Sequence, residues 1–134
     1  MDYLNDAFGG LAPRKDKDGA IKFCLNVILK DDEIDRLVEL LSVDSKIIAI
    51  EGQPSWTLER RNERASAAAY AAWPKNAQFR AYVDPDGYEL AFPEGFYDLP
   101  TFQQFVSTAM RAYKARNPER TSSANQVLSL VSPR

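Results

Sequence analysis

Histidine is absent from this chain of 134 residues. Histidine is the commonest general base near neutral pH, the usual activator of a serine or cysteine nucleophile and the commonest metal ligand. Its absence excludes Ser–His and Cys–His mechanisms and argues against an enzyme, although carboxylates, lysine, tyrosine or serine still permit other chemistry. The sequence predicts no catalytic residue, no metal site and no cofactor.

Cysteine is almost as scarce. The single Cys24 cannot form an internal disulfide, so the sequence does not require an oxidising compartment. Only Lys22 and Lys30 lie close enough in sequence to activate its thiol, and we interpret Cys24 as a small, partly buried side chain.

Long hydrophobic runs are also missing. None approaches the ~18 residues that a membrane-spanning helix needs, and the first residues lack the features of a secretory signal. Apolar residues make up 45% of the chain and charged residues 27%, which is typical of a folded domain. We therefore expect one domain, 1–134, in the cytoplasm and without membrane association.

The predicted secondary structure begins after an N-terminal arm. Residues 1–19 contain glycines, a proline and mixed charges without a sustained period, which predicts a loosely ordered arm. Residues 21–30 alternate between apolar and other side chains, as a half-buried strand does. The acidic residues 31–33 suit a helix N-terminus, and the apolar spacing that follows predicts a helix over 32–42.

The middle of the chain predicts a short strand over 46–50 and then a second helix. Ser55 is a candidate cap for a helix from about residue 56 to Trp73, because the segment is rich in alanine and Pro74 ends it. An extended lead-in over residues 54–57 is equally compatible with the sequence.

A β-hairpin is the clearest local signal. The turn Asp84-Pro85-Asp86-Gly87 combines a preset φ angle, a side chain that bonds local backbone and a glycine, which predicts antiparallel strands over 78–83 and 88–92. Asp98 then precedes a helix that ends before Pro118.

That helix carries an apolar stripe that we expect to be buried against the hairpin. Its main members are Phe102, Phe105, Val106 and Met110. Residues 117–134 are predicted to be a mobile tail or a short docking element. The element order favours an α+β single domain, with a predominantly antiparallel sheet, a C-terminal β-hairpin and helices packed on it, and with 20–116 as its core.

An acidic, aromatic-rich segment is the candidate partner-binding site. Residues 84–100 contain five acidic residues and no basic residue, and aromatic side chains lie between them. Such a surface suits a basic partner, since charge speeds encounter and aromatic side chains anchor contacts. The candidate residues are Asp84, Asp86, Tyr88, Glu89, Glu94 and Asp98. Alternatively, the aromatic side chains face the core and the acids mark turns and caps.

Two sets of basic residues allow two interpretations. Arginines match phosphate geometry, but interspersed charges also simply keep a helical surface in water. Glu59 and Glu63 interrupt the first set, so direct nucleic-acid binding is not predicted. The sets are Arg60, Arg61 and Arg64, and then Arg111, Lys114, Arg116 and Arg120.

The stretch from Asp84 to Leu90 resembles the last hairpin of glyoxalase and bleomycin-resistance proteins. That resemblance implies a metal-dependent enzyme in which a glutamate on the final strand, with histidines elsewhere, ligates the metal. This chain has no histidine, and Glu89 follows the turn too closely for the glutamate role.

In overall profile the chain is similar to bacterial immunity proteins that neutralise contact-dependent or polymorphic toxins. The profile consists of a small, slightly acidic chain without a catalytic constellation and with a local acidic, aromatic segment. The resemblance implies a non-catalytic protein that masks a basic, nuclease-like toxin domain through residues 84–98. The alternatives are a secretion chaperone or adaptor and a small metal-dependent enzyme, and the oligomeric state stays open.

Overall fold

The computed structural model describes residues 2–42, 47–52, 55–62 and 65–131. The α-helices within these ranges are α1 (Leu4–Phe8), α2 (Gly19–Lys30), α3 (Ile34–Leu41), α4 (Leu99–Arg116) and α5 (Thr121–Val131). The strands are β1 (Ala49–Gly52), β2 (Trp56–Arg60), β3 (Phe79–Val83) and β4 (Glu94–Tyr97), and the short 3₁₀ helices are η1 (Ala67–Tyr70) and η2 (Pro118–Arg120). The predicted α+β class with an antiparallel sheet is confirmed.

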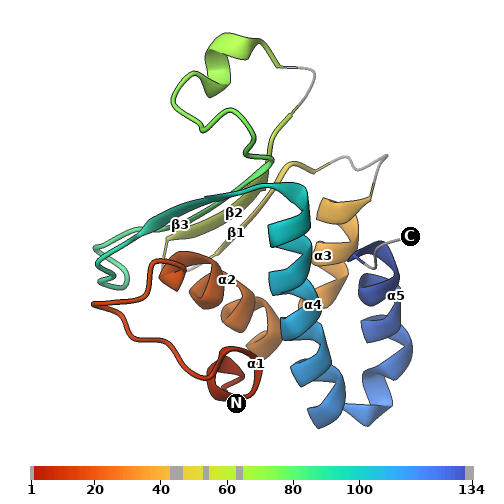
Figure 1. The fold of residues 1–134 in the computed structure, drawn as a ribbon. Coiled ribbons are helices and arrows are strands. Elements are labelled where there is room, and N and C mark those ends of the chain that lie inside the picture. The colour runs from red at the N-terminus through yellow and green to blue at the C-terminus, as the bar shows by residue number, and fades with distance from the viewer. Residues whose placement is uncertain (1, 43–46, 53–54, 63–64, 132–134) are drawn as a thin grey trace.

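The strands form one antiparallel meander in the order β1-β2-β3-β4. Each strand pairs with the next along the chain, with Leu58 opposite Ala81 and Ala81 opposite Gly95. The helices gather on one side of this sheet, where α2 contacts β2, β3 and β4 (Figure 1). One face of the sheet therefore meets the helical layer and the other face points away from it.

Burial along β3 shows which residues meet the helices. Phe79, Ala81 and Val83 are buried, whereas Arg80 and Tyr82 are half-buried. Successive side chains on a strand point to opposite faces, so the first three belong to the core and the other two to the far face.

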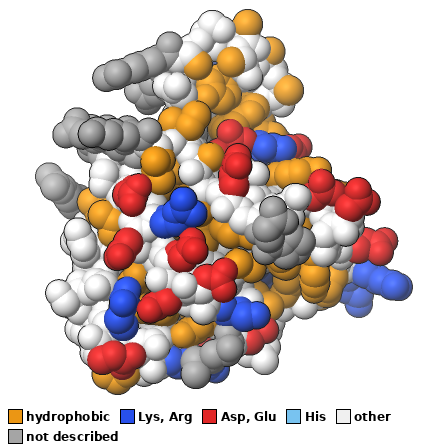
Figure 2. All heavy atoms as spheres, turned by 180° about the vertical axis from the view of Figure 1, so that it is seen from behind, with side chains coloured by type: hydrophobic (Ala, Val, Ile, Leu, Met, Phe, Trp, Pro, Cys, Tyr) orange, Lys and Arg blue, Asp and Glu red, His pale blue; other side chains and the backbone are white. Residues whose placement is uncertain are grey.

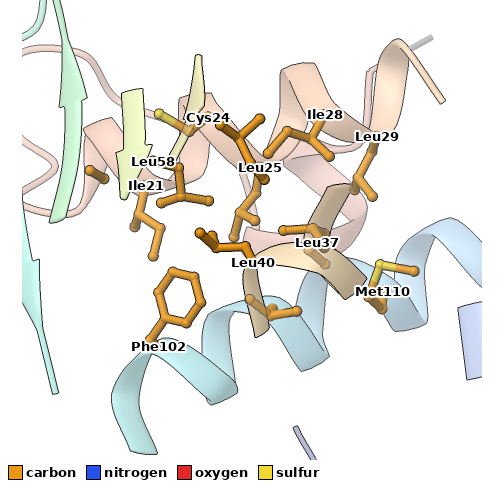
Figure 3. Close-up of a cluster of buried hydrophobic side chains, with 14 of the residues drawn as sticks. Ile21, Cys24, Leu25, Ile28, Leu29, Leu37, Leu40, Leu58, Phe102 and Met110 are labelled. Atoms are coloured by element: carbon orange, nitrogen blue, oxygen red, sulfur yellow. The ribbon is translucent and has the colours of Figure 1, made fainter. Parts of the chain in front are cut away.

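The core lies between the sheet and helices α2, α3 and α4. Figure 3 shows apolar side chains from these helices and from β2 meeting in one cluster. Burial of each large side chain contributes about 1.5–3 kcal/mol, so this cluster is the main source of stability. Its members include Ile21, Cys24, Leu25, Ile28, Leu29, Leu37, Leu40, Leu58, Phe102 and Met110.

Helix α2 replaces the strand predicted over 21–30, and that prediction is wrong. The segment is apolar on nearly all sides, so its residues fit a period of two and a period of 3.6 equally well. The buried residues follow the helical spacing, as Ile21, Cys24, Leu25, Ile28 and Leu29 show. Tertiary contact with both the sheet and α4 decides between the two periods.

The helix predicted from residue 56 to Trp73 is also wrong. Residues 56–60 form β2, one of the two inner strands, and only the short η1 follows it within the described part of this connection. Residues 63–64 lie outside the described residues. All the alanines from Ala67 to Ala72 are exposed, and only Tyr70 in this stretch is half-buried. A longer helix here would therefore bury little apolar surface.

The predicted hairpin is correct in its first strand and turn and wrong in its second strand. The partner of β3 is β4, which begins at Glu94, so the strand predicted over 88–92 is part of the loop. That stretch instead packs on the N-terminal arm: Leu90 is buried and the Ala91 N–H donates to the Pro13 carbonyl at 2.8 Å. Because these contacts tie residues 90–91 to the arm, their backbone groups are not available to extend the β3–β4 ladder.

Two predicted helices are confirmed with small changes in their bounds. The helix expected over 32–42 is α3, and the helix after Asp98 is α4. The predicted strand over 46–50 overlaps β1 only in its last residues, and residue 46 lies outside the described residues. On α4, three of the four stripe residues are fully buried, whereas Phe105 is half-buried between the rings of Phe8 and Tyr97.

Residues near both ends of the chain pack on the core. The prediction of a loose arm over 1–19 is wrong for its first residues, because Tyr3 is only 4% exposed and α1 packs on α4. The Tyr3 N–H donates to Asn26 Oδ1 at 2.9 Å, and the Tyr3 hydroxyl accepts from Asn117 Nδ2 at 2.9 Å. At the other end α5 packs on α3 and α4, so the predicted segment 117–134 is docked as far as Val131, and residues 132–134 lie outside the described residues.

Candidate functional site

The face of the sheet that points away from the helices carries a mixed set of polar and aromatic side chains. No helix in the described ranges covers this face (Figure 1). We call it the outer sheet face and define it by Glu51, Thr57, Glu59, Arg80, Tyr82, Glu94 and Phe96. The strand register places these residues side by side, since Glu59 lies opposite Arg80 and Tyr82 opposite Glu94.

Arg80 organises the centre of the outer sheet face. Its Nη1 lies 2.7 Å from Glu59 Oε1 and its Nε lies 2.6 Å from Glu94 Oε2, and its guanidinium stacks 4.8 Å from the Tyr82 ring centroid. Partial burial opposes the charge of Arg80, but the hydrogen bonds to both glutamates outweigh it and raise its pKa. The outer sheet face therefore carries three carboxylates and one guanidinium, because the exposed Glu51 on β1 adds to the two glutamates that pair with Arg80.

The predicted site residues separate into structural and exposed groups. Asp84 closes the hairpin turn, because its Oδ1 accepts from the Asp86 N–H at 2.9 Å. Asp98 caps α4 by accepting from the Thr101 N–H at 2.9 Å. The turn-and-cap interpretation therefore accounts for Asp84 and Asp98, whereas Glu94 belongs to the outer sheet face.

Three predicted residues lie exposed on residues 84–93, which we call the hairpin loop. Asp86 and Glu89 form no ion pair with the described part of the chain. Tyr88 is 38% exposed with its ring 4.9 Å from that of Phe23, and the nearby Phe92 is 42% exposed. The loop thus presents two carboxylates and two aromatic rings to solvent.

A basic neighbour, which the sequence pattern does not reveal, lies beside the hairpin loop. The N-terminal arm contacts the loop at Pro13 and carries the exposed Arg14, Lys15 and Lys17. Figure 2 shows acidic and basic side chains together at this edge of the molecule. The loop is therefore less acidic as a surface than residues 84–100 are as a sequence, and the outer sheet face carries the stronger negative bias.

The basic residues flagged in the sequence mostly have structural partners. Arg60 donates to the Ser42 carbonyl, Arg116 pairs with Asp6, Arg120 pairs with Asp32 and Lys114 donates to Asn125. Arg111 is exposed, Arg61 lies against the rings of Tyr70 and Trp73, and Arg64 lies outside the described residues. The solvated-face interpretation therefore covers only part of the set.

Cys24 is buried inside the core and takes no part in the candidate surface. Its thiol donates to the carbonyls of Thr57 at 3.7 Å and Tyr82 at 3.9 Å, and burial raises its pKa far above its ordinary value. A thiol that stays protonated is a poor nucleophile. The described residues bring together no group of three His, Cys, Asp or Glu side chains that could hold a metal, and none of their helices is long and apolar enough to cross a membrane.

The Asp98 cap makes stability depend on pH. The hydrogen bonds from Thr101 lower the pKa of Asp98, so the ionised cap stabilises the fold above the ordinary carboxyl pKa and this contribution is lost as the pH falls through the lowered value. We expect Asp98→Asn, which still accepts a hydrogen bond at an N-cap, to fold with near-parent stability at pH 7. Between about pH 5 and pH 2, where carboxyl groups become protonated, it should lose less stability than the parent. Urea unfolding of both proteins across that range measures the difference, and parallel curves would contradict it.

Comparisons with models of protein families, with curated proteins and with solved structures find no match to this chain. Function is therefore inferred from the geometry of the described residues. The sequence did not predict Glu51, Glu59 and Tyr82 as site residues, because their segments were expected to form other elements or the inner part of the hairpin. The signal that finds them is the two-residue alternation of burial along β1, β2 and β3.

Proposed function

We propose that this protein is a non-catalytic binding protein, similar to bacterial immunity proteins, that masks the active surface of a basic, nuclease-like toxin domain. The observation that carries the proposal is the outer sheet face, which no described helix covers and on which three carboxylates outnumber the single guanidinium of Arg80. A basic partner complements this charge, and complementary charge speeds its encounter with the surface.

The arrangement of the glutamates supports binding with little ordering cost. Arg80 holds Glu59 by Oε1 and Glu94 by Oε2, which leaves the second oxygen of each carboxylate as an acceptor for a partner's arginine or lysine. Side chains that are already fixed lose less entropy when a partner binds.

Aromatic side chains supply the apolar part of the same surface. Tyr82 and Phe96 lie half-buried on the outer sheet face, and the exposed Tyr88 and Phe92 extend it along the hairpin loop. Aromatic residues are the commonest energetic anchors of protein interfaces. The proposed contact surface therefore joins the outer sheet face to the hairpin loop.

The test measures complex formation with the protein encoded by the neighbouring gene, because an immunity protein is expected beside its toxin. We expect a 1:1 complex by calorimetry and an association rate that falls as salt screens the surface charges. Glu51→Gln/Glu94→Gln should slow association about tenfold at low salt and less at high salt. Asp86→Asn/Glu89→Gln should slow it by a smaller factor, because the basic arm already offsets the loop.

The matched control removes the same charge from another exposed surface. Asp35→Asn/Glu39→Gln neutralises two exposed acids on α3, away from the sheet, and should leave the association rate close to that of the parent. Absence of a complex overturns the proposal. Equal slowing by the control pair, or parent-like rates for the Glu51/Glu94 pair, would show that net charge or another surface is responsible. A complex only with unfolded, extended segments would instead favour a chaperone or adaptor.

A further inference from the structure

A segment projects from the end of the sheet between β2 and β3. Its described residues are 61–62 and 65–78, and it stands clear of the helical layer at the top of Figure 1. Hydrophobic side chains gather on this projection in Figure 2. It is the largest departure of the described chain from the sandwich of sheet and helices, and it meets the proposed binding surface where Trp73 contacts Phe96.

An aromatic cluster and two hydrogen bonds connect the described parts of the projection to each other and to the sheet. The rings of Tyr70 and Trp73 meet edge to face at 4.9 Å, and Trp73 contacts the Phe96 ring at 5.3 Å. The Asn62 N–H donates to the Tyr70 hydroxyl at 2.7 Å, and the Arg61 N–H donates to the Gln78 carbonyl at 2.7 Å. The base of the projection is thus tied across its two strands and packed on β4.

An open pocket of about 530 Å³ lies within the projection. Its volume falls in the range of small-molecule sites, roughly 300–1,000 Å³. Two basic side chains, Arg61 and Lys75, line it together with the rings of Tyr70 and Trp73 and the amide of Gln78, and the described lining includes no acidic residue. The pocket therefore combines positive charge with flat apolar walls.

Arg61 differs from the half-buried Arg80 and Arg120 in forming no ion pair with a residue that the structure describes. Arg80 and Arg120 each form an ion pair, and Arg60 donates to a backbone carbonyl. The guanidinium of Arg61 instead lies 5.1 Å from the Tyr70 ring centroid and 5.7 Å from that of Trp73. Its Nε, like that of Arg120, is buried without a hydrogen-bond acceptor among the described residues. A partly desolvated cation of this kind gains from an anion that binds beside it.

We propose that this pocket binds a phosphomonoester carried on a small planar group, such as a nucleoside monophosphate. The planar fork of Arg61 matches phosphate oxygens, and the flexible ammonium of Lys75 supplies a second positive charge. A phosphomonoester carries nearly two negative charges at neutral pH, which matches this pair better than the single charge of a carboxylate. The planar group lies against the rings of Tyr70 and Trp73, as bases do on aromatic side chains.

The test titrates the full chain with three probes by calorimetry: adenosine 5′-monophosphate, inorganic phosphate and adenosine. We expect the nucleotide to bind with a dissociation constant of about 1 mM or below, phosphate to bind at least about tenfold more weakly and adenosine to give no binding heat. Arg61→Gln should weaken nucleotide binding by about tenfold or more, and Arg61→Lys by a smaller factor because it keeps the charge without the planar fork.

Two further variants separate binding from folding and from net charge. Lys75→Gln alters an exposed side chain, so it should fold like the parent and still weaken nucleotide binding severalfold. Arg14→Gln removes the same charge from the N-terminal arm and should bind the nucleotide like the parent. The proposal is overturned if the nucleotide shows no binding at a concentration of about 10 mM, because a weaker affinity would not be meaningful. Adenosine or phosphate binding as tightly as the nucleotide, or equal loss in Arg14→Gln, overturns it as well.

Discussion

Replacing Phe102 with alanine is expected to lower the free energy of unfolding by about 3–5 kcal/mol. Phe102 is fully buried on α4, and its ring stacks on that of Phe79 with centroids 3.7 Å apart and planes 2° from parallel. This pair joins α4 to the central part of the sheet, so the truncation removes contacts from both layers and leaves a cavity that tightly packed neighbours cannot fill. Urea denaturation followed by circular dichroism measures the loss.

Phe105 provides the matched control on the same helix. It is half-buried and contacts the rings of Phe8 and Tyr97 at the edge of the core, so Phe105→Ala should cost roughly half as much as Phe102→Ala. Equal losses in the two variants would mean that both rings contribute alike and that the burial difference does not govern stability.

Asp32→Ala is expected to lower the free energy of unfolding by about 2–3 kcal/mol. Asp32 joins α2 to α3 with a φ angle of 57°, which residues other than glycine, asparagine and aspartate rarely adopt. Its Oδ1 accepts from the hydroxyl of the buried Tyr113, and its Oδ2 lies 3.5 Å from Arg120 Nη1. Burial and the neighbouring Asp32 raise the pKa of Tyr113 to about 12, so this hydroxyl stays a donor at neutral pH.

Two substitutions at the same position separate the hydrogen bond from the backbone conformation. Asp32→Asn keeps an acceptor and tolerates a positive φ, so it should cost about 1 kcal/mol or less. Asp32→Gly loses the acceptor but removes the strain, so it should cost about 1 kcal/mol less than Asp32→Ala. If Asp32→Ala and Asp32→Gly lower the free energy of unfolding equally, the φ angle carries no energetic cost. If Asp32→Asn lowers it as much as Asp32→Ala, the hydrogen bond from Tyr113 contributes nothing.

Helix α2 shows why local patterns predicted the fold class and missed individual elements. The α3 and α4 stripes have polar residues on their other sides, so one period fits them and both helices were predicted. In α2 almost every side chain is apolar or half-buried, and the choice between strand and helix depends on β3 and on α4, which lie far away in sequence.

The candidate surface was predictable only where its chemistry lies within one segment. The exposed residues of the hairpin loop follow from the turn signal at Asp84, and the cap role of Asp98 follows from its position before Pro100. The triad of Glu59, Arg80 and Glu94 requires three strands in register, which no single segment encodes. The basic arm beside the loop was likewise hidden, because residues 14–17 and the loop are distant in sequence.

The burial of the single cysteine provides an internal reporter of how the helical layer detaches from the sheet. Cys24 is fully buried on α2, and its thiol lies against the backbone of β2 and β3. A thiol reagent therefore modifies the native chain only through conformations in which α2 has moved off these strands. The modification rate at low denaturant measures the free energy of that opening without any introduced label, and its denaturant dependence distinguishes a local opening from complete unfolding.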